Sequence, residues 1–129
     1  MIRVCIAGAT GWAGRALAAG VVAAEDLRLV SAVSRSAAGS DLGVAFGGAA
    51  LGVPVTASVA EALGDVDVLV DDTSHLVVGA NVRSALERGV AVVVGASGLT
   101  AAEFAEIDDL ARQCGVGVIA AGNFSLTAA

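Results

Sequence analysis

Short runs of hydrophobic residues alternate along the chain with longer segments in which small and apolar residues recur at helical spacing. The runs at 2–7, 27–33, 66–70, 91–94 and 116–120 show no helical period, so each predicts a strand buried on both faces. The segments at 12–24, 58–64, 75–88 and 100–114 predict helices between them. Residues 53–55 predict only a short or edge strand, because Pro54 has no amide hydrogen to donate.

Capping residues indicate where several helices begin and end. Two helix starts carry a hydroxyl residue followed three positions later by a glutamate: Ser58 with Glu61, and Thr100 with Glu103. Gly89 and Gly115 are expected to end the two longest helices of the second half. The helix that begins near residue 75 is expected to be capped by one of Asp72, Thr73 and Ser74. The segment 36–52 is rich in Gly, Ala and Ser and predicts a long loop with a helical turn near Asp41.

Strands that alternate with helices predict an α/β fold: a doubly wound parallel sheet in a Rossmann-like, three-layer domain that spans residues 1–129. Ligands of such folds bind outside the carboxyl ends of the strands. Five polar segments follow predicted strands and are expected to meet at that edge: 8–14, 34–36, 71–74, 95–98 and 122–125.

Composition narrows the function classes. Of the 129 residues, 57% are hydrophobic, and the net charge is −6, which argues against disorder, nucleic-acid binding and anionic-membrane binding. There is no Lys or Tyr and a single His, so chemistry that needs a Lys base or a Tyr acid is not complete in this chain. Cys5 and Cys114 are expected to be free thiols, which suits the cytoplasm. Clusters of His and Cys that would hold a metal are absent from the sequence. We expect neither a signal peptide nor a membrane span.

The first strand is followed at once by three glycines, at positions 8, 11 and 14, that open the first helix. In this place Gly8 permits a tight turn, Gly11 lets the backbone approach a pyrophosphate, and Gly14 lets the helix pack against the sheet. The pyrophosphate would lie on free N–H groups at the helix N-terminus. The motif therefore predicts a dinucleotide site.

The residues at the end of the second strand indicate which dinucleotide the site prefers. Sites that prefer NAD usually place an acidic residue there to hold the ribose 2′-hydroxyl, whereas this chain has Ser34 and Arg35. A guanidinium with neighbouring hydroxyl groups suits a 2′-phosphate. We therefore expect NADPH as the cofactor, with NADH as the alternative if Arg35 is only a solvated loop residue.

Four motifs together resemble a known family. The loop GATGWAG, a strand that ends in DDT, the segment VVVGASGLT and the late AAGNFSL look like the N-terminal domain of dihydrodipicolinate reductase. The resemblance covers essentially the whole chain. By position, it implies that the cofactor contacts come from Gly8, Ala9, Thr10, Gly11, Trp12, Ala13, Gly14, Ser34, Arg35, Asp71, Thr73, Gly95, Ala96, Ser97, Ala121, Gly122, Asn123 and Phe124. Trp12 is expected either to pack on the cofactor or, slightly more in keeping with its position, to form a hydrophobic staple on its helix.

The chain departs from that family in two respects. Asp72 stands where the family has an aromatic residue, and a carboxylate near a pyrophosphate is expected to weaken binding. The family's second domain, with its substrate site, catalytic His, Lys donor and tetramer-forming sheet, has no counterpart here. No catalytic residue is assigned, and His75 does not match the family's catalytic position.

The resemblance implies a reductase that uses NAD(P)H to transfer a hydride to a cyclic imine precursor in lysine (diaminopimelate) biosynthesis, in full-length members that form homotetramers. The 129 residues alone would then be inactive and would need the missing domain or its equivalent. Two alternatives are a stand-alone nucleotide-binding or regulatory module and the cofactor domain of a semialdehyde or acyl-phosphate reductase. The last requires a reactive Cys, yet Cys114 is expected at a helix C-terminus, where the dipole disfavours a thiolate.

Overall fold

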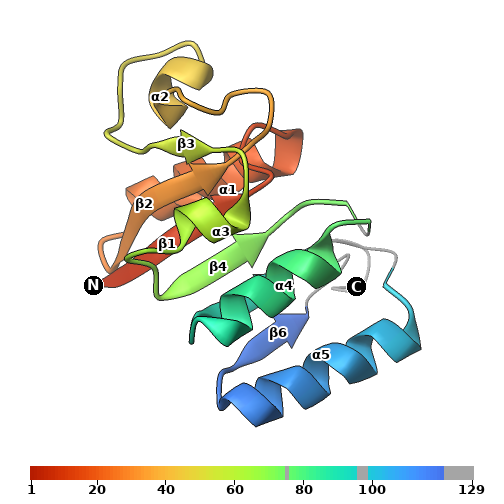
Figure 1. Cartoon of the computed structure of the whole chain (residues 1–129). Coiled ribbons are helices and arrows are strands. Elements are labelled where there is room, and N and C mark those ends of the chain that lie inside the picture. Colours follow the sequence, from red (N-terminus) through yellow and green to blue (C-terminus); the bar gives the residue numbers. More distant parts are fainter. Residues whose placement is uncertain (75, 96–98, 121–129) are drawn as a thin grey trace, which may run out of the picture.

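The computed structural model, which describes residues 1–74, 76–95 and 99–120, is a parallel six-stranded sheet with helices on both faces (Figure 1). The strands are β1 (Ile2–Ala7), β2 (Leu27–Val33), β3 (Val55–Thr56), β4 (Val68–Asp71), β5 (Ala91–Val94) and β6 (Val118–Ala120). The helices are α1 (Trp12–Ala23), α2 (Leu42–Ala45), α3 (Val59–Ala62), α4 (Val78–Glu87) and α5 (Ala101–Cys114). The predicted Rossmann-like fold class is confirmed.

The helices divide between the two faces of the sheet. The short α3 packs with β2 and β3, α4 with β4 and β5, and α5 against α4, while α1 packs with β1 and β2 (Figure 1). Each face has its own core cluster of buried residues. One contains Val78 and Val82 of α4 with Ile107 of α5, and the other contains Ala18 of α1 with Leu42 of α2. The resulting three layers follow from strands that are apolar on both faces.

The strand order β3-β2-β1-β4-β5-β6 reverses beside β1, the first strand. From β1 the chain moves outward to β2 and β3, and it then returns to the other side of β1 with β4. Ala7 at the end of β1 is level with Val33 on one side and Asp71 on the other. The crevice between the ends of β1 and β4 is the place where such sheets bind ligands.

Helix α5 begins and ends where the sequence predicts. The Thr100 side chain accepts a hydrogen bond from the amide of Glu103, and the Glu103 carboxylate accepts one from the amide of Thr100. Gly115 ends the helix in the left-handed conformation at φ +67°. Within the described residues, no helix is both long and apolar enough to cross a membrane.

Two predicted helix starts differ from the structure. Ser58 is the N-cap of α3, but its side chain makes no capping hydrogen bond, so the predicted capping box does not form. Helix α4 begins at Val78 with Val77 as its N-cap, rather than near residue 75 with Asp72, Thr73 or Ser74 as a side-chain cap. The physical reason is a preceding turn, in which the Ser74 carbonyl accepts hydrogen bonds from the amides of Val77 and Val78.

The loop 36–52 contains the helical turn expected near Asp41. The Asp41 carboxylate accepts hydrogen bonds from four backbone amides, those of Gly43, Val44, Leu51 and Val53. These bonds lower the pKa of Asp41. Arg15 of α1 ties the turn to the first helix, because its guanidinium stacks 4.7 Å from the Phe46 ring and donates to the Phe46 carbonyl. The loop is thereby fixed to the first turn of α1.

Candidate functional site

The glycine-rich turn after β1 packs more closely than residues with a side chain would allow. Gly8 has φ +80°, and a Cβ at Gly8 would lie 2.5 Å from the carbonyl oxygen of Asp72. A Cβ at Gly14 would lie 2.1 Å from the carbonyl oxygen of Gly8. Gly11 is less crowded, since its Cβ would lie 3.3 Å from that same oxygen. Gly8 and Gly14 therefore serve close packing, as expected, and Gly11 lies at the exposed tip of the turn.

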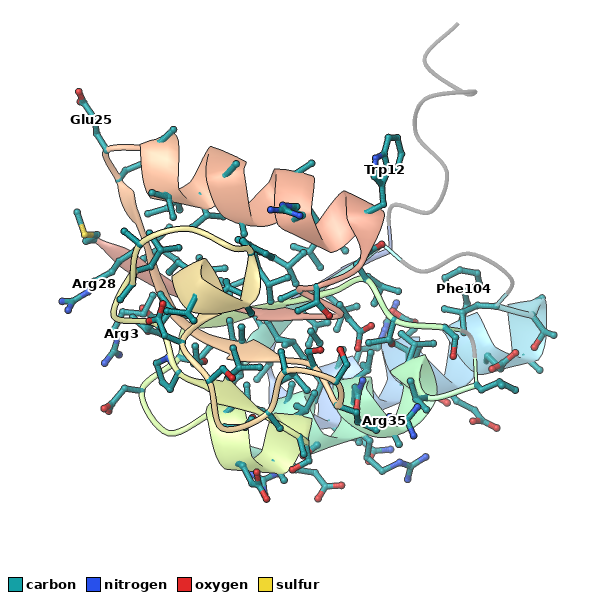
Figure 2. The ribbon with its side chains drawn as sticks, turned by 90° about the horizontal axis from the view of Figure 1, so that it is seen from above. Arg3, Trp12, Glu25, Arg28, Arg35 and Phe104 are labelled. Atoms are coloured by element: carbon teal, nitrogen blue, oxygen red, sulfur yellow. The ribbon has the colours of Figure 1, made fainter. Side chains whose placement is uncertain are left out.

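The N-terminus of α1 opens from this turn toward solvent. Gly11 is the N-cap and supplies no side chain, so the first amides of the helix have no capping acceptor. Ala9 is fully buried and offers only its backbone. Trp12 is 94% exposed and stands away from α1 (Figure 2), so the staple expected of it does not form. The arrangement leaves a helix N-terminus of the kind that binds phosphate groups.

A chain of hydroxyl groups connects the glycine-rich turn to the end of β2. The Oγ1 of Thr10 lies 2.7 Å from the Oγ of Ser34, and the Ser34 Oγ lies 3.1 Å from the Oγ of Ser36. Ser34 is buried, while Ser36 is exposed. Two predicted site segments, from the first and second strand ends, are therefore in direct contact.

A cleft of about 490 Å³ extends from the end of β2 to the start of α4. Four residues predicted for the site line it: Gly8, Ser34, Arg35 and Thr73. Ser74, from the segment 71–74 expected at this edge, also lines the cleft. Sequence reasoning missed the other lining residues, which are Val33, Ala57, Ser58, Val59, Val77 and Asn81. Arg35 is exposed and lies on the side of the sheet that α3 and α4 cover (Figure 2). The cleft combines a cationic rim with apolar and hydroxyl-bearing walls.

Asp71, at the end of β4, is buried and fully engaged within the protein. One carboxylate oxygen accepts from the amide and the hydroxyl of Thr73, and the other accepts from the side-chain amide of Asn81 at 3.0 Å. The side chain has no exposed surface, so Asp71 can act on a ligand only by positioning Thr73 and Asn81. Asn81 lies ten residues away in α4, and no local signal in the sequence links it to this strand end.

Asp72 lies at the centre of the same edge. Its amide donates to the Ala7 carbonyl, and its carbonyl faces Gly8, so its backbone joins the ends of β1 and β4. Burial, with the negative charge of Asp71 as a second cause, raises the pKa of Asp72. The carboxyl group extends toward β5, because a Cβ at Gly95 would lie 3.6 Å from its Oδ1.

The fourth predicted segment begins at Gly95, whose amide donates to the Asp71 carbonyl at 2.8 Å. This bond brings the end of β5 to the same edge. The remaining predicted cofactor contacts, Ala96, Ser97, Ala121, Gly122, Asn123 and Phe124, lie outside the described residues, as does His75.

A second cleft, of about 520 Å³, lies at the opposite end of the sheet and is lined by Arg3, Arg28, Glu61 and Asp65 among others. Its lining carries two arginines and two carboxylates, so its charge does not favour an anion. The Arg3 guanidinium pairs with Asp67 at 3.0 Å and approaches Asp65 at 3.9 Å, so acidic groups already occupy its donors. In Figure 2, Arg3 and Arg28 lie far from Trp12 and Arg35.

Neither cysteine is placed as a nucleophile. Cys5 is buried in β1, and burial raises the pKa of its thiol to about 11. Cys114 is the last residue of α5, at the negative end of the helix dipole. Chemistry of the acyl-phosphate or semialdehyde reductase type, which needs a thiolate, therefore finds no support in these two residues.

Comparison with known proteins gives the family. The family model "Dihydrodipicolinate reductase, N-terminus" matches residues 2–124. The 4-hydroxy-tetrahydrodipicolinate reductase of Moorella thermoacetica is 36% identical over 98% of this chain and 48% of its own length. The enzyme of that name from an Anaeromyxobacter species is 42% identical over 78% of this chain and 38% of its own length.

Solved structures of two reductases are similar to this chain along most of its length. A dipicolinate-bound dihydrodipicolinate reductase from a Paenisporosarcina species has a TM-score of 0.77 and 28% identity, over 92% of this chain and 46% of its own. A Synechocystis biliverdin reductase in complex with biliverdin and NADP+ has a TM-score of 0.73 and 26% identity, over 92% of this chain and 37% of its own. The chain thus spans about half the length or less of the relatives it matches. It belongs to the dihydrodipicolinate reductase N-terminal family.

Proposed function

We propose that this chain is the NADP(H)-binding half of a 4-hydroxy-tetrahydrodipicolinate reductase. The observation that carries the proposal is the contact between Thr10 and Ser34, which joins the glycine-rich turn to the end of β2 beside Arg35. A helix N-terminus of the kind that binds phosphate and a cleft lined by Arg35 are thereby held on one edge, at the reversal of strand order.

The described residues suit the adenosine half of the cofactor. The pyrophosphate would lie on the amides of Trp12 and Ala13, at the positive end of α1, while the Gly11 amide is held by the Gly8 carbonyl. The cleft would take the adenosine, with the apolar side chains of Val33 and Val59 beside the base. Arg35 and the exposed hydroxyl of Ser36 would meet the 2′-phosphate.

This arrangement supports NADPH over NADH. Arg35 at the rim of the cleft would stabilise the two negative charges of a 2′-phosphate, and the described residues place no carboxylate among those lining the cleft to hold a free 2′-hydroxyl instead. NADH would bind through the same turn without the guanidinium contact. The two cofactors are therefore expected to differ in affinity rather than in position.

The nicotinamide half would lie toward the ends of β4 and β5. We assign contacts there to Gly95, Ala96 and Ser97, and to the segment 121–124, as the family resemblance implies. The bound cofactor would supply the hydride. The protein would contribute orientation, through the buried Asp71 that fixes Thr73 and Asn81 around the crevice.

The complete reaction would need a second half. The relatives are named as 4-hydroxy-tetrahydrodipicolinate reductases, and the chain matches about half of their length. We propose that residues 1–129 form one cofactor domain of a cytoplasmic, homotetrameric enzyme of lysine biosynthesis. The substrate site and proton donor would come from a further segment or a separate chain.

Calorimetric titration of the 129-residue chain with NADPH and then NADH, at low salt, tests the proposal. Micromolar binding of NADPH with clearly weaker NADH is the expected result. Equal affinities for the two cofactors would contradict a contact between Arg35 and the 2′-phosphate. No binding of either cofactor would contradict the proposed function.

A further inference from the structure

One carboxylate at the carboxyl edge of the sheet has no hydrogen-bond partner among the described residues. Asp41, Asp67 and Asp71 each accept several hydrogen bonds. The Asp72 carboxylate accepts none, although its backbone is held at the Ala7 carbonyl and against Gly8. A charged group that is partly removed from water without compensation costs free energy. Such costs persist most often at functional sites.

Asp72 lies on the side of the crevice where the nicotinamide ribose of a dinucleotide is expected. A dinucleotide that crosses the reversal of strand order has its adenosine toward β2 and its pyrophosphate over the turn after β1. Its nicotinamide ribose then lies toward β4 and β5. The Asp72 carboxyl group extends toward Gly95 at the end of β5, which is the side expected for that ribose.

The chemistry of the carboxylate matches that sugar. A carboxylate carries two oxygens that only accept hydrogen bonds, and a ribose presents two neighbouring hydroxyl donors. Among the described residues, no positive side chain forms an ion pair with Asp72. The arginines that form ion pairs there are Arg3 and Arg112, and their partners are other carboxylates. Its accepting capacity is thus free for a ligand.

We propose that Asp72 accepts hydrogen bonds from the hydroxyls of the nicotinamide-side ribose and so positions that half of the cofactor. The inference rests on the proposed function and deepens it.

Three ligands and one near-isosteric variant test this assignment. NADPH and 2′-phospho-ADP-ribose both contain the second ribose, whereas adenosine 2′,5′-bisphosphate lacks it. Asp72→Asn is expected to weaken the first two by about tenfold and to leave the third within about twofold, as for loss of a hydrogen bond to a charged group. Asp26→Asn, an exposed carboxylate near the start of β2, is the matched control for net charge and should change none of them.

The possible results distinguish an error in the role of Asp72 from an error in the proposed function. Tighter binding of NADPH by Asp72→Asn would show repulsion and overturn the inference, as would unchanged affinity, while the proposed function would stand. Failure of the unmodified chain to bind any of the three ligands would overturn both. If Asp72→Asn loses its fold by circular dichroism, Asp72→Ser provides the same comparison without the charge.

Discussion

The Oγ atoms of Thr10 and Ser34 lie 2.7 Å apart, although 24 residues separate them in the sequence. Thr10 belongs to the exposed turn that opens α1, and Ser34 is buried at the end of β2. The contact fixes the phosphate-binding turn relative to the segment that carries Arg35. The contact would therefore hold the groups that bind the 5′-phosphate and the 2′-phosphate of the adenosine at a fixed distance from each other.

Removal of the Ser34 hydroxyl should loosen this spacing. Ser34→Ala deletes the contacts to Thr10 and to Ser36, so we expect a loss of about 1 kcal/mol in the free energy of unfolding. NADPH affinity should fall by more than NADH affinity. Urea unfolding and calorimetry measure the two effects. Ser40→Ala, an exposed position in the same loop, is the control, and an equal effect of both variants would contradict the argument.

Two glycines of α1 should respond to alanine in opposite directions. Gly14→Ala would place a Cβ 2.1 Å from the Gly8 carbonyl oxygen, so we expect destabilisation by about 3 kcal/mol or more and loss of cofactor binding. Gly20 lies in the same helix with no atom within 4 Å of its added Cβ. Gly20→Ala should therefore stabilise the protein by about 0.5–1 kcal/mol. Similar thermal unfolding midpoints for the two variants would refute the packing role of Gly14.

The sequence predicts the strands well because the signal is local. β1, β2 and β5 begin and end at the predicted residues, and the Thr100 side chain forms the predicted capping box. Each of these features depends on residues within a few positions of one another. Parallel topology alone predicts that the polar segments after the strands share one edge. The structure brings the segments that begin at Gly8, Ser34, Asp71 and Gly95 together there, and 122–125 lies outside the described residues.

Failures occur where a distant residue decides the geometry. Thr73 does not cap α4: its amide and hydroxyl bond to Asp71, two residues earlier, and the side chain of Asp71 is held in turn by Asn81, ten residues away. Neither the burial of Asp71 nor the place of Asn81 in the cleft has a local signature. Trp12 is 94% exposed in the described structure, although its place at the start of α1 favoured a staple.

Acid should weaken the protein through Asp67. Hydrogen bonds and charge from Arg3 lower the pKa of Asp67 from 3.8 to about 2. Because the folded pKa lies below the unfolded value, the stabilisation is fully present above about pH 4 and is lost as the pH falls toward 2. Asp67→Asn should remove this part of the pH dependence. Urea unfolding between pH 2 and pH 6 checks it, and an unchanged pH profile in the variant would contradict the assignment.

Asp72 should have the reverse effect on stability. Burial and Asp71 raise its pKa, so ionisation of Asp72 costs stability as the pH rises through its folded pKa, and the cost is absent below the unfolded value. Asp72→Asn should therefore be more stable than the unmodified chain at pH 7, with the difference vanishing in acid. Thermal unfolding at pH 7 and at pH 3 provides the comparison. A less stable variant at pH 7 would show that the carboxylate is compensated within the protein.

Arg35 should distinguish the two cofactors. Arg35→Ala removes a cation from the rim of the cleft, and we expect NADPH to bind about tenfold or more weakly, as for loss of a charge-assisted bond to phosphate. NADH should change little. Arg28→Ala, at the other end of the sheet, removes the same charge and is the control (Figure 2). Equal losses for NADPH and NADH would exclude a specific contact with the 2′-phosphate.

The most direct test of the central claim is the mapping of amide chemical shifts as NADPH is added to the isotopically labelled chain. The proposed site predicts that the largest changes occur at Gly8–Gly14, at Ser34–Ser36 and at Thr73, with the amides around Arg3 and Arg28 unaffected. Changes confined to the cleft at the amino ends of the strands, or no changes at all, would contradict the assignment of this edge as a dinucleotide site.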